Sequence, residues 1–219
     1  MTTQQNNEKN TINYNDYLAE SFEDLELKDN LIRGIYSSGY EKPSVIQQKA
    51  IKPLIDGRDV IGQAQSGTGK TATFSIGMLQ LIDETVPRTQ ALILSHTREL
   101  SLQILTVIQS LSKYINITTN LSVGGTLSNV NIDEVLKNPQ VIIGTPGRVF
   151  DMINKKALNT KYLKLLILDE ADELLSRHFS NQIYDIFKFL PNNIQVGLFS
   201  ATMTEEFFTL SKNFMRDPV

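Results

Sequence analysis

Three of the four carboxylates in the stretch LLILDEADELL lie within four positions of one another, directly after an apolar run. The acids are Asp169, Glu170 and Asp172. An unbroken apolar run is typical of a strand that is buried on both faces, and carboxylates this close repel one another unless positive charge faces them. We therefore expect a cation beside the end of a buried strand.

A candidate phosphate site occurs earlier, in the stretch AQSGTGKT that begins at Ala64, between the apolar run DVIGQA and the helical pattern TATFSIGMLQLI. Gly67 and Gly69 allow backbone amides to surround phosphates. The Lys70 ammonium can reach the outer phosphates, and the Thr71 hydroxyl can bind Mg²⁺. The strict phosphate-loop pattern has Gly in place of Ala64, so the alternative is a Gly-rich turn that only caps a helix. The order of strand, loop and helix favours the phosphate loop.

The two patterns together assign roles to the acids. A strand that ends beside a phosphate loop places Asp169 near the same Mg²⁺, through coordinated water. Glu170 is then expected to orient and deprotonate the water that attacks the γ-phosphate of ATP. Asp172 has no such direct role, and it fits equally well as an acid that favours a helix N-terminus.

The elements that position these groups are short apolar runs alternating with longer helical patterns. The runs are DVIGQA, ALILS, NLSV, QVIIG, LLILD and QVGLF. Their continuous hydrophobicity predicts an α/β fold with a parallel sheet flanked by helices on both faces. Residues 1–20, rich in Asn, Gln and Thr, are expected to form a flexible polar tail. One domain is expected to fill residues 21–219.

Composition excludes several classes of protein. With 41% hydrophobic residues among 219, the chain can form a substantial core, and it contains no apolar run of the roughly 18 residues that a membrane helix needs. The absence of cysteine excludes disulfides and thiolate metal sites. Because Lys and Arg number 21 against 24 Asp and Glu, any nucleic acid must be held by a local set of groups rather than by a strongly basic surface.

Base selection is expected from the stretch GYEKPSVIQ. The Tyr40 ring can stack on a base, and the Gln47 amide offers a donor and an acceptor that suit the edge of adenine. The stretch therefore favours ATP over GTP. The alternative is a core aromatic residue and a surface Gln.

Three further stretches could hold a nucleic-acid backbone. In TPGR, Thr145 is placed as a helix N-cap with Pro146 at the first helical position, which leaves free amides beside Arg148. TREL likewise puts Thr97 and Arg98 at a helix start, and the pair at 124–125 is Gly-Gly, which permits close approach of a backbone. Each stretch alone could equally be ordinary capping or a tight turn.

Taken in order, AQSGTGKT, TREL, GG, TPGR, DEAD and SAT resemble the DEAD-box family of ATP-dependent RNA helicases over nearly all of residues 22–219. The similarity is greatest to the initiation-factor four-A group and its exon-junction relative. It implies a RecA-like fold, ATP and Mg²⁺ as cofactors, and RNA as partner.

The resemblance also assigns the remaining site residues. ATP binding would use the aromatic and amide positions, the loop and its supports: Phe22, Tyr40, Ser44, Gln47, Ala64, Gln65, Ser66, Gly67, Thr68, Gly69, Lys70 and Thr71. RNA backbone would be gripped by the three polar stretches: Thr97, Arg98, Gly124, Gly125, Thr145, Pro146, Gly147 and Arg148. Hydrolysis would be coupled to strand separation by four residues: Asp172, Ser200, Ala201 and Thr202. Thr202 could instead form a helix capping box with Glu205.

Two departures from the family pattern matter. Ser95-His96 stands where members usually have Ala-Pro, and His96 could add a donor near RNA or be a tolerated loop residue.

The family's second domain has no counterpart here, so the chain is expected to be an N-terminal half that is monomeric, cytoplasmic or nuclear, and nearly inactive alone. Expected partners are single-stranded or duplex RNA, the second helicase domain and scaffold proteins of initiation. An ATP-gated RNA clamp that recruits partners is the alternative function.

Overall fold

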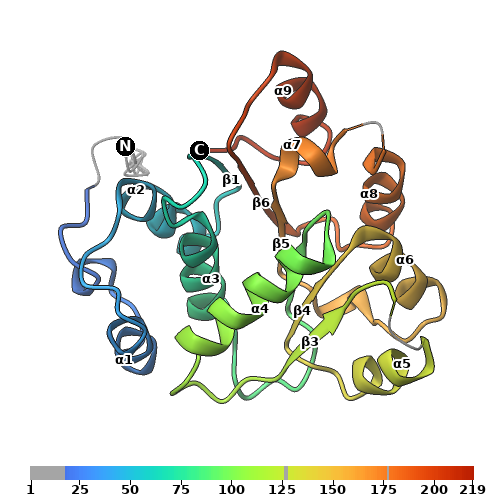
Figure 1. Cartoon of the computed structure of the whole chain (residues 1–219), viewed down its shortest axis with the longest axis horizontal. Coiled ribbons are helices and arrows are strands. Elements are labelled where there is room, and N and C mark those ends of the chain that lie inside the picture. Colours follow the sequence, from blue (N-terminus) through green and yellow to red (C-terminus); the bar gives the residue numbers. More distant parts are fainter. Residues whose placement is uncertain (1–17, 126–127, 177) are drawn as a thin grey trace, which may run out of the picture.

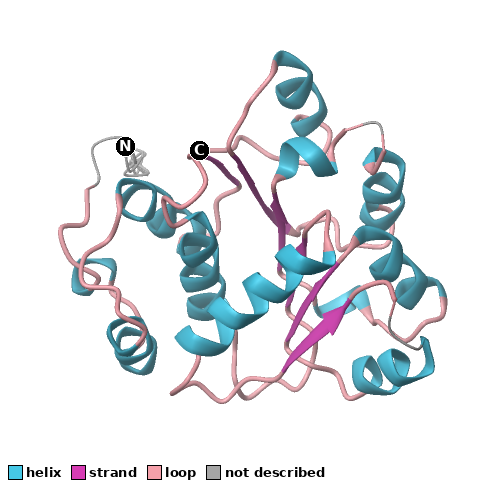
Figure 2. Ribbon diagram, viewed as in Figure 1, coloured by secondary structure: helices cyan, strands magenta, loops and turns pink. Residues whose placement is uncertain are grey.

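The computed structural model describes residues 18–125, 128–176 and 178–219. The tail predicted over residues 1–20 lies almost entirely outside the described residues. All six apolar runs form strands, as the sequence predicts: β1 (Val60–Gln63), β2 (Ala91–Leu94), β3 (Thr119–Ser122), β4 (Val141–Gly144), β5 (Leu165–Asp169) and β6 (Gln195–Ser200). They make one sheet in the order β1-β6-β5-β2-β4-β3, and every neighbouring pair is parallel (Figure 2).

Helices precede the first strand, follow the last and lie in the connections between strands. Those before β3 are α1 (Asp29–Ser37), α2 (Val45–Ile55), α3 (Lys70–Leu81) and α4 (Arg98–Leu111). Those after it are α5 (Ser128–Leu136), α6 (Pro146–Asn154), α7 (Ala171–Leu174), α8 (Ser180–Phe187) and α9 (Glu205–Ser211). Two short 3-10 turns complete the described elements: η1 (Glu23–Leu25) and η2 (Thr160–Tyr162).

Two hydrophobic clusters lie on opposite faces of the sheet (Figure 1). Helices α1 to α4 supply the first cluster, and α5 to α9 supply the second. Successive strand residues alternate between the two, since Ile93 belongs to the first whereas Leu92 and Leu94 belong to the second. The four inner strands are buried at every residue, which explains why they read as continuous apolar runs, whereas the edge strands β1 and β3 are partly exposed. Within the described residues, no helix combines the length and the apolar character that crossing a bilayer requires.

Parallel pairing brings the chemistry to one edge. Because all six strands run the same way, the residues that follow them gather at the carboxyl edge of the sheet, where ligands bind in such folds. The loops that leave β1, β2, β4, β5 and β6 at this edge carry, in turn, the phosphate loop, TREL, TPGR, the acids and SAT.

Candidate nucleotide and RNA site

The phosphate loop joins β1 to α3 and turns through two glycines in the left-handed region. Gly67 has φ +81° and Gly69 has φ +97°, conformations that other residues rarely adopt. The buried Lys70 ammonium donates to the backbone carbonyl of Gln65 at 3.0 Å and also to that of Ala64. Lys70 therefore lies inside the loop, where it can exchange these carbonyls for phosphate oxygens.

A pocket of about 370 Å³ lies against this loop and unites the groups that the sequence assigns to phosphate chemistry. It is lined by Tyr40, Ser66, Gly67, Gly69, Lys70, Thr71, Ala72, Leu100, Gln103, Asp169 and Glu170. The sequence assigned no role in this pocket to Leu100, the last residue of TREL, or to Gln103, which lies outside every motif. The acids and the loop thus face one space, as expected from parallel strands that end at the same edge of the sheet, although β6 lies between β1 and β5.

Asp169 is the most perturbed acid in the pocket. Burial raises the pKa of Asp169 to about 6, and the neighbouring Glu170 charge acts in the same direction. The Glu170 backbone N–H donates to Asp169 Oδ1 at 3.1 Å and opposes this shift, as do the charges of Lys70 and His96. A buried carboxylate that is costly to ionise is stabilised by a cation placed against it.

The donor set fits Mg²⁺ bound together with phosphates. The Thr71 hydroxyl and the Asp169 carboxylate line the same pocket, and no group of three or more His, Asp or Glu that could hold a metal occurs in the described part of the chain. Mg²⁺ at nucleotide sites takes one or two protein oxygens and completes its shell with phosphates and water. The Thr71 hydroxyl and the Asp169 carboxylate would supply those protein oxygens.

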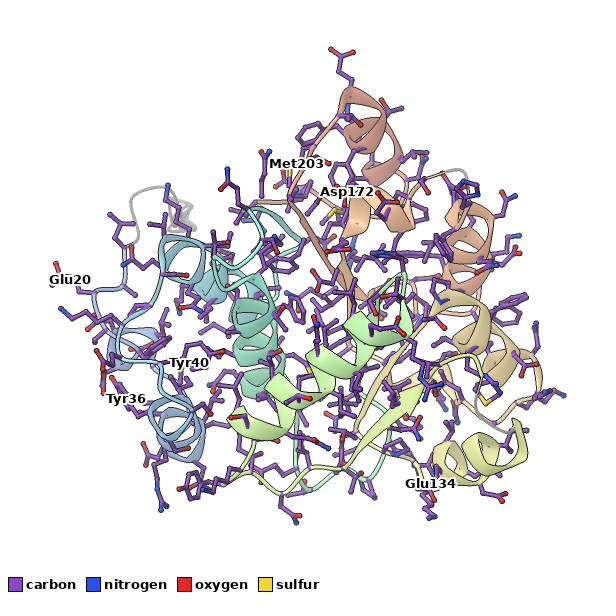
Figure 3. The ribbon with its side chains drawn as sticks, viewed as in Figure 1. Glu20, Tyr36, Tyr40, Glu134, Asp172 and Met203 are labelled. Carbon is purple, nitrogen blue, oxygen red and sulfur yellow. The ribbon has the colours of Figure 1, made fainter. Side chains whose placement is uncertain are left out.

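Tyr40 and Gln47 differ in how they lie. Tyr40 lines the pocket and packs against the first hydrophobic cluster (Figure 3). Gln47 is only 2% exposed, and its Oε1 accepts from the Ser44 backbone N–H at 2.8 Å. The Ser44 hydroxyl donates to the Thr68 carbonyl at 2.9 Å. Ser44 and Gln47 thus tie α2 to the phosphate loop, and adenine recognition by Gln47 stays a prediction.

Phe22, expected to support the loop, lies in the core. Its ring is fully buried in the first hydrophobic cluster and meets Tyr36 edge-on at 6.1 Å between centroids. A second hollow of about 620 Å³ lies on the other side of the loop, beside Ser44, Lys49, Gln65 and Thr68. It is the larger of the two, but the acids line only the smaller pocket.

The three polar stretches predicted to hold a backbone do come together. They line an open groove of about 520 Å³, with His96, Arg98, Gly124, Thr145, Gly147, Arg148, Asp151, Phe179 and Gln182 along its walls. Thr97 caps α4 by accepting from the Leu100 N–H at 3.2 Å, and Thr145 precedes Pro146 at the start of α6. Asp151, Phe179 and Gln182 were not predicted, because each lies outside the quoted stretches.

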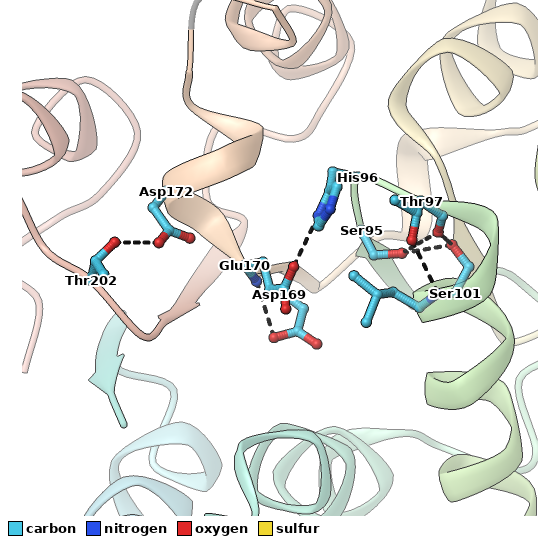
Figure 4. A network of polar contacts seen from close by, with 9 residues as sticks. Ser95, His96, Thr97, Ser101, Asp169, Glu170, Asp172 and Thr202 are labelled. Atoms are coloured by element: carbon cyan, nitrogen blue, oxygen red, sulfur yellow. Dashed lines mark hydrogen bonds and ion pairs between the residues drawn. The ribbon is translucent and has the colours of Figure 1, made fainter. Parts of the chain in front are cut away.

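Ser200 and Thr202 reach the acidic loop, as the sequence suggested. The Thr202 hydroxyl donates to the Asp172 carboxylate (Figure 4). The alternative, in which Thr202 caps a helix with Glu205, is wrong. The residue that caps α9 is Thr204, whose hydroxyl accepts from the Phe207 N–H at 3.2 Å.

Comparison with known proteins agrees with this geometry. The family model described as DEAD/DEAH box helicase matches residues 44–210, most of the chain. The chain belongs to this helicase family. It is 54% identical over 204 residues to an ATP-dependent RNA helicase eIF4A of Aspergillus oryzae, covering 93% of this chain and 48% of that protein. It is 55% identical to eukaryotic initiation factor 4A of Drosophila melanogaster, covering 91% and 50% respectively.

Solved helicase structures share the fold. A DEAD box protein from Methanococcus jannaschii superposes with a TM-score of 0.88 at 37% identity, covering 92% of this chain and 55% of that one. Dbp5 of S. cerevisiae, solved with RNA and ADP BeF3, gives 0.84 at 36% identity, covering 92% and 51%. The chain thus spans about half the length of the helicases it matches.

The family departure at Ser95-His96 has structural consequences in this helicase domain. Ser95 is fully buried, and its hydroxyl lies 2.6 Å from that of Ser101 on α4. His96 does not point only toward the open groove, because its Nδ1 lies 3.1 Å from Glu170 Oε2 (Figure 4). No local pattern in the sequence predicts this contact, since it depends on which strands are neighbours.

Proposed function

We propose that the whole protein is an ATP-dependent RNA helicase of the eIF4A type, acting in translation initiation in the cytoplasm, and that this chain is its ATP-binding half. The observation that carries the proposal is the meeting of two sites at one sheet edge. The nucleotide pocket contains Asp169 and Glu170, and the groove beside it presents Arg98 and Arg148 with the starts of α4 and α6.

The nucleotide pocket supports hydrolysis of ATP. The loop amides and Lys70 would bind the β- and γ-phosphates, and Thr71 and Asp169 would hold Mg²⁺, which neutralises phosphate charge when bound. Glu170 would take a proton from water as the water oxygen attacks the γ-phosphorus. The bond from that phosphorus to the bridging oxygen of ADP breaks, and ADP and phosphate leave. Tyr40 and Gln47 would favour adenine.

The groove supports binding of an RNA backbone without reading its sequence. Helix N-termini offer backbone amides and the arginines offer charge, which are the groups that bind phosphates in any sequence. Gly124 leaves room for close approach, since a Cβ added there would meet nothing within 4 Å, whereas a Cβ at Gly125 would lie 3.3 Å from the Arg98 guanidinium. Such a local grip suits a chain whose net charge is −3.

We also propose that the site is completed by a second helicase domain. Phosphoryl-transfer enzymes commonly gain about 10³ to 10⁵ in rate from an arginine supplied outside the phosphate loop, and the arginines at the edge described here, Arg98 and Arg148, line the RNA groove instead. The chain alone is thus expected to bind nucleotide weakly as a monomer and to hydrolyse it barely. Single-stranded or duplex RNA and scaffold proteins of initiation are the proposed partners.

Steady-state ATPase measurements with and without single-stranded RNA test the proposal, on this chain and on the whole protein. We expect RNA-stimulated turnover and strand separation only when both domains are joined, because linkage raises the effective concentration of the second domain. Strong RNA-stimulated hydrolysis by residues 1–219 alone would contradict the two-domain proposal. Long-lived RNA binding without turnover would favour a clamp over a helicase.

A further inference from the structure

His96 joins the RNA groove to the nucleotide pocket. It lines the groove together with Arg98, Thr145 and Arg148, and its Nδ1 lies 3.1 Å from Oε2 of Glu170, which lines the nucleotide pocket. We propose that His96 is a positioning residue that holds the Glu170 carboxylate for catalysis and transmits RNA binding to it. This inference rests on the proposed role of Glu170 as the base.

The sheet explains why these two residues meet. Strands β2 and β5 are parallel neighbours, with Leu94 paired to Leu168. His96 and Glu170 each lie two residues beyond that pair, so they emerge together at the carboxyl edge (Figure 4). The contact therefore follows from strand order and needs no movement of either loop.

The backbone on the His96 side is held firmly. The Ser95 hydroxyl lies 2.6 Å from the Ser101 hydroxyl, which itself donates to the Thr97 carbonyl at 3.0 Å. The Ser95 N–H donates to the Gly144 carbonyl at 3.1 Å, which joins this loop to the end of β4. The imidazole is thus carried on a loop that is fixed on both sides, as a group that positions another must be.

Glu170 by contrast has a conformation that needs support. It has φ +50°, in the left-handed region that is uncommon for residues other than glycine. Its side chain is 39% exposed, and among the described residues His96 is the one basic side chain within ion-pair distance of its carboxylate. With Oε2 beside His96, Oε1 is left for the attacking water. Without His96, the carboxylate would sample several rotamers.

The contact between His96 and Glu170 is close but does not have the geometry of a hydrogen bond. Nδ1 is buried but is not aligned with Oε2 as a hydrogen bond would be, and catalytic contacts of this kind often tighten only in the substrate complex. A phosphodiester in the groove would lie against the same ring whose Nδ1 faces Glu170. RNA would thereby restrict the ring and align Nδ1 with the base. The proline that the family usually has at this position offers no donor, so this link is a feature of this chain.

A pair of variants of similar size tests the proposal in the whole protein. His96→Asn keeps a donor near the Nδ1 position, whereas His96→Leu has none. We expect His96→Leu to lower the RNA-stimulated kcat about tenfold, as loss of orientation does, with the KM for ATP and the Kd for RNA within about twofold of wild type. His96→Asn should keep at least half of the wild-type kcat. His178→Ala, at an exposed histidine that does not line the groove, is the control and should match wild type.

Several outcomes separate the explanations. Equal kcat in the Asn and Leu variants, or a Leu variant within twofold of wild type, would overturn the positioning role. If the variants bind RNA more weakly but keep the wild-type kcat, His96 only contacts RNA, and the positioning role is also overturned. Glu170→Gln is measured alongside. If that variant keeps turnover, the proposed function of Glu170 fails, whereas its loss of turnover with no effect at His96 rejects this inference alone.

Discussion

The Thr202 hydroxyl donates a hydrogen bond to the Asp172 carboxylate, which ties the segment after β6 to the first turn of α7. Ser200 holds the segment in shape, since its hydroxyl donates to the Thr202 carbonyl at 2.6 Å and accepts from the Thr202 N–H at 3.1 Å. Burial raises the pKa of Asp172, but hydrogen bonds from Thr202 and Ser200 outweigh burial and lower it. Figure 3 shows Asp172 near Met203, where α7 meets this segment.

The first prediction concerns this tie. Thr202→Val keeps the shape of the side chain and removes the hydroxyl, so it should separate hydrolysis from strand separation. We expect the RNA-stimulated ATPase rate of the whole protein to stay within about threefold of wild type, while the rate of duplex unwinding falls at least about tenfold, roughly 1.4 kcal/mol. Parallel ATPase and unwinding assays give both rates.

A neighbouring threonine provides the control. Thr204→Val removes the N-cap of α9, which should cost about 1 kcal/mol of stability but leave the ratio of unwinding to hydrolysis unchanged. Should both variants change that ratio equally, the Thr202 contact would have only a structural role.

The second prediction separates binding from chemistry in the nucleotide pocket. Lys70→Ala removes the ammonium that lies inside the phosphate loop, so ATP binding should become too weak to detect by titration. Glu170→Gln keeps the shape of the side chain but cannot accept a proton, so binding should persist while turnover falls at least about 10²-fold. Titration and turnover assays on both variants check this, and equal loss of affinity in both would refute the assigned roles.

The sequence predicts the sheet well because burial on both faces leaves a strong mark. All six continuous apolar runs became strands, and the helix starts at Thr97 and Thr145 carry recognisable capping residues. Strand order leaves no such mark, because it is decided by long-range packing. The contact between His96 and Glu170 depends on β2 lying beside β5, so no local pattern could reveal it.

Two helix starts differ from the sequence prediction. Ser44 and Gln47 have the spacing of a capping box, and they form one at the start of α2, whereas the prediction for Gln47 is base recognition alone. At α9 the sequence offers two threonines two residues apart, and the capping pattern fits Thr202 with Glu205. In the structure α9 starts after Thr204 instead, and Phe207 in its first turn packs into the second cluster.

The third prediction concerns base choice at Gln47. Gln47→Ala should weaken ATP and ADP binding about tenfold while leaving the poor binding of GTP nearly unchanged, because only adenine loses its partner. Titrations with the three nucleotides, made well below the melting temperature, measure this, since loss of the cap should also lower stability by about 1 kcal/mol. Gln48→Ala, at an adjacent amide that donates to the Pro43 carbonyl at 3.2 Å, is the matched control. If wild-type protein binds GTP as tightly as ATP, the assignment of adenine recognition to Gln47 is wrong.

The last prediction uses two acids of opposite behaviour. Burial raises the pKa of Asp169 from 3.8 to about 6, so the folded protein favours the neutral carboxyl. The contribution of Asp169 to the free energy of unfolding is therefore complete below about pH 3.8 and is lost as the pH rises through about 6. Its charge then costs the fold up to about 3 kcal/mol at neutral pH. Asp169→Asn should therefore melt at a higher temperature than wild type at pH 7.5, without nucleotide or Mg²⁺, and the difference should shrink as the pH falls from 6 to 4.

The lowered pKa of Asp172 reverses the sign of the pH effect on stability. The contribution of the Asp172 carboxylate to stability is present above about pH 3.8 and is lost in acid. Asp172→Asn should accordingly melt below wild type at pH 7.5. Thermal melting of both variants across this pH range decides the matter, and shifts of the same sign would show that burial of charge at Asp169 is not what limits stability.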